Sequence, residues 1–190
     1  MLLLDLTLPI PAENIALDEA LLDAAEEDQS PAEILRFWES PQPLVVLGRS
    51  SKVSEEARLD ACRAAKVPIL RRCSGGAAIV AGPGCLMYAV VLSYEQHPEL
   101  RSLDRAHCFV LSRLREALLP LCANVQIRGT SDLALGERKF SGNSLRCKRN
   151  YFLYHGTLLY DFDLSLLTEY LGTAPRQPVY RQQRDHGEFV

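Results

Sequence analysis

Residues 69–93, ILRRCSGGAAIVAGPGCLMYAVVLS, determine the fold that we expect. Ile69–Arg72 and Ala77–Ala81 are strand-like pieces joined through a serine and two glycines, and Gly82-Pro83-Gly84 is a turn sequence. Leu86–Ser93 is a strongly apolar run, which is typical of a central strand. Three strands in succession argue against a strict alternation of strands and helices.

Further strands and helices are expected on both sides of this stretch. Runs of apolar and aromatic residues predict strands at Ile34–Trp38, Leu44–Leu47, Asp132–Leu135, Arg138–Ser141 and Tyr151–Tyr160. Helical spacing and capping residues predict helices around Leu17–Ala25 with Asn14 as N-cap, after Ser54, over Val110–Leu121, and over Leu164–Leu171 after Asp163. This mixture predicts an α+β domain, with a mixed sheet and helices packed on it.

Composition sets limits on the class of protein. The chain has 190 residues, which suits one domain over residues 1–190, and its net charge of −3 gives no basic field to attract nucleic acid. No apolar run approaches the roughly 18 residues of a membrane span, so no membrane partner is expected. The first residues, MLLLDLTLPIPAEN, lack a basic region and predict a first strand rather than a signal peptide.

The six cysteines and the tail carry two further expectations. No two cysteines lie closer than eleven residues apart, so the CxxC spacing of a zinc site is missing, and unpaired thiols indicate a reducing cytoplasm. The tail 175–190 is polar, rich in arginine and without periodicity. It is expected either to dock as an extended loop or to lead into further sequence.

The densest polar cluster is the segment Arg71-Arg72-Cys73-Ser74-Gly75-Gly76-Ala77. Glycine lets backbone N–H groups approach an anion closely, and arginine can clamp a phosphate or a carboxylate with two hydrogen bonds. A surface turn with solvated arginines would show the same composition. The segment is not a Walker A loop, because GxxxxGK[ST] is missing.

Two other groups of residues could carry chemistry. Asp132, Lys139, Ser141, Gly142 and Asn143 cluster at the expected hairpin, and strand alternation places Lys139 and Ser141 on the same face. Lys139 could steady a phosphate and a carboxylate at once, although a lysine just past a turn also fits a solvated position. His155-Gly156 lies inside an aromatic strand, where the glycine suggests close backbone approach and the histidine also fits a core position.

Taken in order, these segments resemble the lipoate–protein ligase family, part of the wider biotin/lipoate ligase group. Five stretches carry the resemblance: NIALDEALL (14–22), LRFWESPQPLVVLGRS (35–50), RRCSGGAAIVAGPGCLMY (71–88), GTSDLALGERKFSGNS (129–144) and HGTLLYDFDLSLLTEYL (155–171). The resemblance implies a mixed, largely antiparallel sheet flanked by helices, and a cleft that binds an acyl-adenylate.

The family's functional residues carry over position by position. Lys139 matches the essential lysine of the family, and Asp132 would help to hold Mg²⁺ or the adenine side. The remaining matches are with residues of the acyl and adenylate pocket: Trp38, Arg49, Arg71, Arg72, Ser74, Gly75, Gly76, Ala77, Ser141, Gly142, His155 and Gly156.

The resemblance also implies substrates and partners. ATP with Mg²⁺ would activate lipoate or octanoate as an acyl-adenylate. The acceptor would be a lysine on the lipoyl carrier domain of a 2-oxoacid dehydrogenase or on a glycine cleavage H-type protein. Because the family often has a C-terminal accessory domain that this chain lacks room for, a separate accessory subunit is an expectation.

The chain departs from the family at two places after the glycines. Ala77 stands where a third glycine is common, and Ala81-Gly82 and Gly84-Cys85 replace the usual His-Asp and Gly-Asn. An ATP-independent octanoyl or lipoyl transferase is therefore the alternative, with Cys147, beside Lys148 and Arg149, as a candidate nucleophile. A non-catalytic acyl-binding homologue is the third reading, and Lys139 argues against it.

Overall fold

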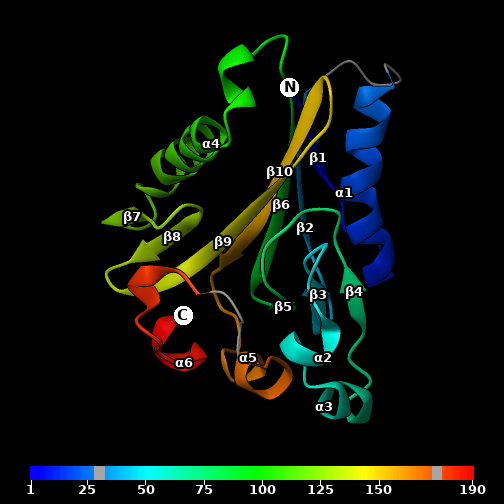
Figure 1. Ribbon diagram of the computed structural model, residues 1–190, viewed down its shortest axis with the longest axis vertical. Helices are drawn as coiled ribbons and strands as arrows, with labels where there is room; N and C mark the ends of the chain where they lie inside the picture. Colours follow the sequence, from blue (N-terminus) through cyan, green and yellow to red (C-terminus); the bar gives the residue numbers. More distant parts are fainter. Residues whose placement is uncertain (28–32, 173–176) are drawn as a thin grey trace.

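The computed structural model describes residues 1–27, 33–172 and 177–190, which form two sheets flanked by helices (Figure 1). The larger sheet has seven strands in the order β1 (Leu2–Asp5), β2 (Ile34–Glu39), β6 (Cys85–Ser93), β10 (Tyr151–Leu159), β9 (Arg138–Cys147), β8 (Asp132–Leu135) and β7 (Val125–Arg128). The smaller sheet has three strands in the order β4 (Ile69–Arg71), β3 (Leu44–Leu47) and β5 (Ile79–Ala81).

Most strand pairs in both sheets are antiparallel. The pairs β1–β2 and β3–β4 are parallel, and the others run in opposite directions. The expected α+β class with a mixed, largely antiparallel sheet is confirmed. β6 lies between β2 and β10, so the apolar run is a central strand, as its sequence predicts.

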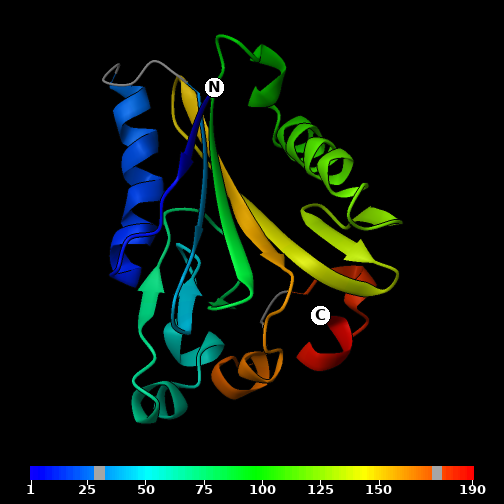
Figure 2. The ribbon, with the colours of Figure 1, turned by 180° about the vertical axis from the view of Figure 1, so that it is seen from behind.

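Two long helices cover opposite faces of the larger sheet. α1 (Pro11–Glu26) packs on Ala89, Val91 and Leu153, whereas α4 (Leu103–Leu118) packs on Val90 and Phe152, the alternate residues of the same strands. Figures 1 and 2 show the two helices on either side of the long β6, β9 and β10 strands. Since β6 and β10 are buried on both faces, both strands are mainly apolar, with His155 and Thr157 of β10 as buried polar exceptions.

The smaller sheet extends the face that α1 covers. Its strand β3 is fully buried against Trp38 and Met87 of the larger sheet, in a core that also contains residues of three short helices. These helices are α2 (Val53–Glu56), α3 (Leu59–Ala64) and α5 (Ser165–Tyr170). None of the helices in the described part of the chain has the length and apolar character that crossing a bilayer requires.

Helix starts were the least accurate predictions. α1 begins at Pro11 with Ile10 as its N-cap, and α2 begins at Val53 with Lys52 as its N-cap, so the predicted caps Asn14 and Ser54 are wrong. Asn14 instead lies inside the helix, fully buried, where its side-chain amide bonds the backbone of Leu8. Asn14 therefore serves a tertiary contact inside the helix and not the N-terminal cap that its local preference predicts.

The C-terminal segment folds back beside the β8–β9 hairpin. Residues 175 and 176 of the predicted tail lie outside the described part of the chain. Residues 177–190 are not an extended loop, because they form η2 (Val179–Arg181) and α6 (His186–Phe189). α6 packs next to α5 and against β9, as Figure 1 shows at the C-terminal end of the ribbon. A further 3₁₀ turn, η1 (Pro98–Arg101), leads into α4.

Candidate active site

A cavity of about 360 Å³ opens between the two sheets and the C-terminal segment. One wall is apolar and belongs to the core between the sheets, with Val46, Ile79, Met87, Leu167 and Leu171. The opposite side is polar and includes Asp132, Lys139, Asn143, Arg181 and His186. An apolar pocket of this size with convergent polar groups is typical of a binding site for a small amphipathic molecule.

Lys139 and Asp132 form an ion pair in this cavity. The Lys139 ammonium lies 2.8 Å from Asp132 Oδ1, and the Tyr180 hydroxyl donates to Asp132 Oδ2 at 2.7 Å. Burial and this bond to Asp132 raise the pKa of Tyr180, which therefore stays protonated and donates. The Lys139 side chain is 27% exposed, so the charge is held in place yet remains reachable from the cavity.

Gly142 makes room for the lysine head group. Asp132 pairs with Gly142 across the hairpin, and a Cβ on Gly142 would lie 2.7 Å from Lys139 Nζ. The register between β8 and β9 also shifts at Leu133/Ala134, so that Phe140 has no partner opposite it. Simple alternation is therefore broken, and Lys139, Phe140 and Ser141 all line the cavity.

Asn143 joins the hairpin to the central strands. Its Oδ1 accepts from the Tyr88 hydroxyl at 2.6 Å, and its Nδ2 donates to the Ser131 carbonyl at 2.8 Å. Burial raises the pKa of Tyr88 well above its ordinary value, so the phenol is a donor at every physiological pH. These bonds fix the segment that carries Ser131 and Asp132 against β9.

The glycine segment is held by the guanidinium of Arg72. Arg72 donates to the carbonyls of Gly75 and Ala77 through Nη2, at 2.5 and 3.0 Å, and to Ser74 Oγ through Nε at 3.1 Å. Burial lowers the pKa of Arg72 to about 10, which leaves it charged at neutral pH. Arg72, Gly76 and Ala77 line the cavity. Arg72, which was predicted to clamp a ligand, therefore holds the glycine segment in shape.

A chain of hydrogen bonds continues from Ser74 into the core. Ser74 Oγ lies 2.5 Å from His155 Nε2, and His155 Nδ1 lies 3.3 Å from Asp18 Oδ2. Asp18 Oδ1 in turn accepts from Arg36 Nη1 at 2.5 Å, and both of these side chains are buried. A proton on His155 Nδ1, donated to Asp18 Oδ2, leaves Nε2 to accept from the Ser74 hydroxyl. The chain anchors the glycine segment to α1 and β2.

Replacing Gly76 and Gly75 in turn should separate the strain and crowding at Gly76 from the effect of replacing a glycine as such. Gly76 has a φ of +89°, and a Cβ there would lie 2.8 Å from Arg72 Nη2, whereas a Cβ on Gly75 meets nothing within 4 Å. Gly76→Ala is expected to lower the free energy of unfolding by about 1–3 kcal/mol, and Gly75→Ala to change it by less than about 0.5 kcal/mol. Urea denaturation of both variants tests this, and equal losses would contradict it.

Five predicted pocket residues lie away from the cavity lining: Ser74 and Gly75 of the glycine segment, and Trp38, Arg49 and Arg71. Trp38 is 1% exposed in the core, where it pairs with Met87 of the cavity wall. Arg71 Nη1 donates to the carbonyls of Gly48, Arg49 and Ser51, so its role is to hold that loop. Arg49 is exposed, and its backbone N–H donates to the Ser74 carbonyl at 2.8 Å. Direct ligand contact for these five residues stays a prediction.

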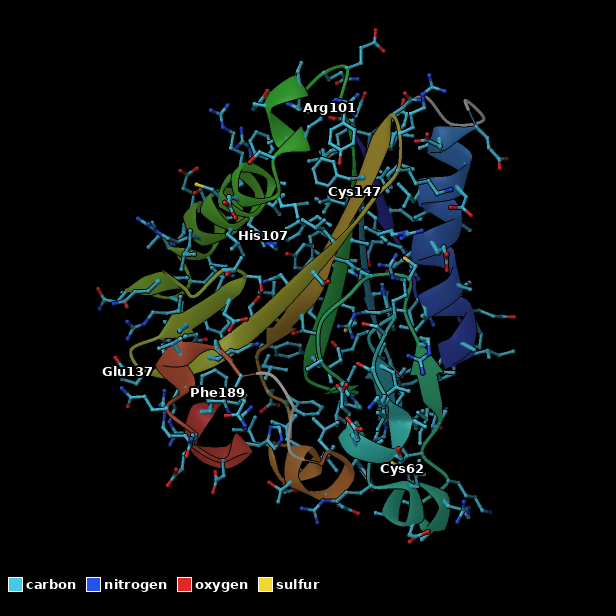
Figure 3. All side chains as sticks on the ribbon, in the orientation of Figure 1. Cys62, Arg101, His107, Glu137, Cys147 and Phe189 are labelled. Carbon is cyan, nitrogen blue, oxygen red and sulfur yellow. The ribbon has the colours of Figure 1, made fainter. Side chains whose placement is uncertain are left out.

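None of the six cysteines, all of which the structure describes, lines the cavity. Burial raises the pKa of Cys73 to about 11 and that of Cys85 to about 12, so both are protonated thiols. Cys147 is exposed at the end of β9. Lys139 lies eight residues earlier on the same strand, which is roughly 25 Å away. Figure 3 shows Cys147 toward the end of the β9–β10 pair remote from Phe189, which lines the cavity.

Several cavity residues were not found from the sequence. Asp18 was assigned only to a helix, and Arg181, His186 and Phe189 belong to a tail without periodicity. The richness of that tail in arginine was the local signal that it could contribute a cation to a site. Among the described residues, no three His, Cys, Asp or Glu side chains are grouped to hold a metal ion, and both Asp132 oxygens are already bonded.

Comparison with known sequences shows the family to which the chain belongs. The profile of the lipoyl protein ligase A/B catalytic domain matches residues 10–186. A protein of Aeropyrum pernix assigned as a lipoate-protein ligase A is 33% identical over 155 residues, which cover 82% of this chain and 56% of that protein. The octanoyltransferase LipM of Carboxydothermus hydrogenoformans is 31% identical over 176 residues, 82% of this chain and 63% of that protein. The chain spans about half the length of several curated relatives that it matches.

Solved structures share the fold. A bipartite lipoate protein ligase of Thermoplasma acidophilum, studied with its E2 lipoyl domain, superposes with a TM-score of 0.79 at 24% identity, over 93% of this chain and 67% of that chain. A lipoate-protein ligase A bound with ATP gives a TM-score of 0.71 at 26% identity, over 100% of this chain and 77% of that chain.

Proposed function

Because the chain belongs to the lipoyl protein ligase A/B catalytic domain family, we propose that it is a lipoate– or octanoate–protein ligase. It activates the acyl group as acyl-AMP and transfers it to a lysine of a lipoyl carrier domain. The observation that supports this most is Lys139, paired with Asp132, in an apolar cavity that no cysteine lines among the described residues. Both the ligase name and the LipM name occur among the relatives, so the choice between them rests on the site.

In the proposed reaction the residues of the chain bind, orient and neutralise charge. The apolar wall takes the eight-carbon chain, which leaves its carboxyl end at the polar side of the cavity. A carboxylate oxygen attacks the α-phosphate of ATP and pyrophosphate leaves; the carrier lysine amine then attacks the acyl carbonyl and AMP leaves. Lys139 offsets the negative charge that develops at the carbonyl and phosphate oxygens in both steps.

Mg²⁺ would accompany the nucleotide rather than be held by a protein site. Both oxygens of Asp132 are engaged by Lys139 and Tyr180, and the described residues offer no cluster of acidic ligands. In this proposal Asp132 positions Lys139 and does not bind the metal ion. Magnesium commonly reaches such sites on substrate phosphates.

Cys85, which stands where the family usually has asparagine, is compatible with ATP binding in the cavity. Cys85 is fully buried in the core between the sheets, and it does not line the cavity. Ala77 lines the cavity but its carbonyl accepts from Arg72, so its altered side chain leaves the shape of the segment intact. Both differences are therefore compatible with adenylate binding in this cavity.

A lipoyl carrier domain is the proposed acceptor, either of a 2-oxoacid dehydrogenase or as a glycine cleavage H-type protein. A separate accessory subunit for the adenylation step remains an expectation. The reaction is proposed for the cytoplasm, since six unpaired cysteines suit a reducing compartment.

A paired assay tests this function. The protein is mixed with octanoate, ATP-Mg²⁺ and a lipoyl carrier domain, and in parallel with octanoyl carrier protein and the same acceptor without ATP. Mass spectrometry of the acceptor reports octanoylation. The proposal expects product in the first mixture alone. Product in the second mixture alone would make the chain an ATP-independent transferase.

Cys147→Ser is expected to retain most ligase activity, because no thioester intermediate is needed and the thiol lies roughly 25 Å along β9 from Lys139. Cys73→Ser and Cys85→Ser, at a half-buried and a buried thiol, are the controls. A loss of nearly all transfer in Cys147→Ser, together with an octanoyl adduct on Cys147 in the wild type that turns over, would favour the transferase.

A further inference from the structure

The C-terminal segment places a second cation in the cavity. Tyr180 bonds Asp132, and the next residue, Arg181, lines the same cavity as Lys139. Arg181 is only 6% exposed, and its guanidinium lies 4.9 Å from the centre of the Phe189 ring. Phe189 also lies 5.9 Å from Lys139 Nζ, so one aromatic ring is shared by both cations.

Most of the hydrogen-bonding capacity of Arg181 is unused. Its Nε donates to the Arg184 carbonyl at 2.9 Å, but Nη1 and Nη2 bond no residue in the parts of the chain that the structure describes. No carboxylate among these residues forms an ion pair with it either. Burial lowers the pKa of Arg181, and the charge of the nearby Asp185 carboxylate offsets this only in part.

The other arginines nearby are satisfied by the protein. Arg184 donates to the carbonyls of Glu137, Tyr180 and Arg181, at 3.0, 3.0 and 3.1 Å, which ties the C-terminal segment to the hairpin. Arg72 is bonded to carbonyls of the glycine segment. Lys139 has Asp132. Arg181 is therefore the cavity-lining cation, among the described residues, whose terminal nitrogens are left for a ligand.

We infer that Arg181 binds the phosphate of the acyl-adenylate, with Nη1 and Nη2 on its two non-bridging oxygens, while Lys139 faces the acyl carbonyl. This rests on the proposed function. The planar fork of a guanidinium matches two oxygens of a phosphate, which a lysine cannot do. An acyl-adenylate carries this anion and an acyl thioester does not, so Arg181 also selects between the two kinds of acyl donor.

Calorimetry with two probes tests the assignment. One probe is 5′-O-(N-octanoylsulfamoyl)adenosine, a stable anionic mimic of octanoyl-AMP, and the other is octanoyl-pantetheine, a neutral thioester. Arg181→Gln is expected to weaken binding of the anionic probe by about 10- to 100-fold, as the loss of charge-assisted hydrogen bonds does. Affinity for octanoyl-pantetheine should change less than about threefold, because apolar contacts supply it.

Arg184→Gln is the matched control, since it removes a guanidinium of the same segment that bonds only carbonyls. It should melt at a lower temperature and keep its preference for the anionic probe. Arg181→Lys keeps the charge without the fork, should fold if Arg181→Gln does not, and is expected to recover part of the affinity.

Wild-type affinity for the anionic probe in both Arg181 variants would overturn this inference and leave the ligase intact. An equal loss for both probes would also overturn it, because Arg181 would then merely support the cavity. Failure of the wild-type protein to bind the anionic probe would instead overturn the proposed function.

Discussion

Lys139→Ala is expected to lower the rate of octanoyl transfer from octanoyl-AMP to a lipoyl carrier domain by about 100- to 1000-fold, the usual effect of removing one preorganised donor from developing charge. The reason is its position in the cavity, where its side chain is 27% exposed and its ammonium lies 2.8 Å from Asp132 Oδ1. Lys139→Arg should recover only part of the rate, because a planar guanidinium is larger than the ammonium that lies close to Gly142.

The same change also has an effect on stability. The sequence predicted partial exposure of Lys139, which is confirmed, and hence a negligible loss of stability. Asp132 is 6% exposed and would keep only the bond from Tyr180, so a loss of about 1–3 kcal/mol in the free energy of unfolding is expected.

Arg138→Ala is the control for Lys139→Ala, because Arg138 is the exposed cation immediately before Lys139 on β9. It should transfer octanoyl at the wild-type rate. A folded Lys139→Ala protein with the activity of Arg138→Ala would contradict the role given to Lys139.

Gly156→Ala is expected to have the second largest effect. A Cβ there would overlap Asn143 Oδ1 and lie 2.8 Å from the Gly142 carbonyl, so β9 would have to move off β10. Overpacking of this kind costs about 1–3 kcal/mol. Loss of the Tyr88–Asn143 hydrogen bond would add about 1 kcal/mol. Acyl transfer should fall steeply too, because Asn143 positions the Ser131–Asp132 segment through its bond to Ser131.

Chemical denaturation of Gly156→Ala, Asn143→Ala and the double variant provides the measurement. Because the crowding involves Asn143, the double variant should lose less stability than the sum of the two single losses. If the two single losses of stability add up in the double variant, the crowding at Gly156 does not involve Asn143. Gly75→Ala, where nothing lies within 4 Å of the added Cβ, controls for replacing a glycine as such.

The parts of the fold that the sequence predicted are those set by local pattern. Apolar runs located β6 and β10, and the Gly136-Glu137 turn located the β8–β9 hairpin, because a strand buried on both faces and a tight turn each leave a local signature. The β-bulge opposite Leu133/Ala134 leaves no such signature. It adds Phe140 to the cavity lining, beside Lys139 and Ser141, which the sequence had placed on one face.

The site residues that the sequence predicted are those that lie in recognisable motifs. Lys139, Gly142 and Gly76 fall in glycine-containing motifs, where close approach of backbone or side chain demands the residue type. Asp18 and Arg181 could not be found in this way. Asp18 acquires its role only when α1 packs against His155 of β10, and Arg181 only when the C-terminal segment folds over the hairpin. Such contacts depend on tertiary packing rather than on local spacing.

The most direct measurement of the central claim supplies the activated intermediate itself. Octanoyl-AMP and a lipoyl carrier domain are mixed with the protein, and the mass of the carrier domain is followed with time beside a reaction without the protein. The account predicts one octanoyl group on the carrier lysine, formed far faster than in the protein-free reaction and lost in Lys139→Ala. Transfer from octanoyl carrier protein, with no acceleration from octanoyl-AMP, would contradict it.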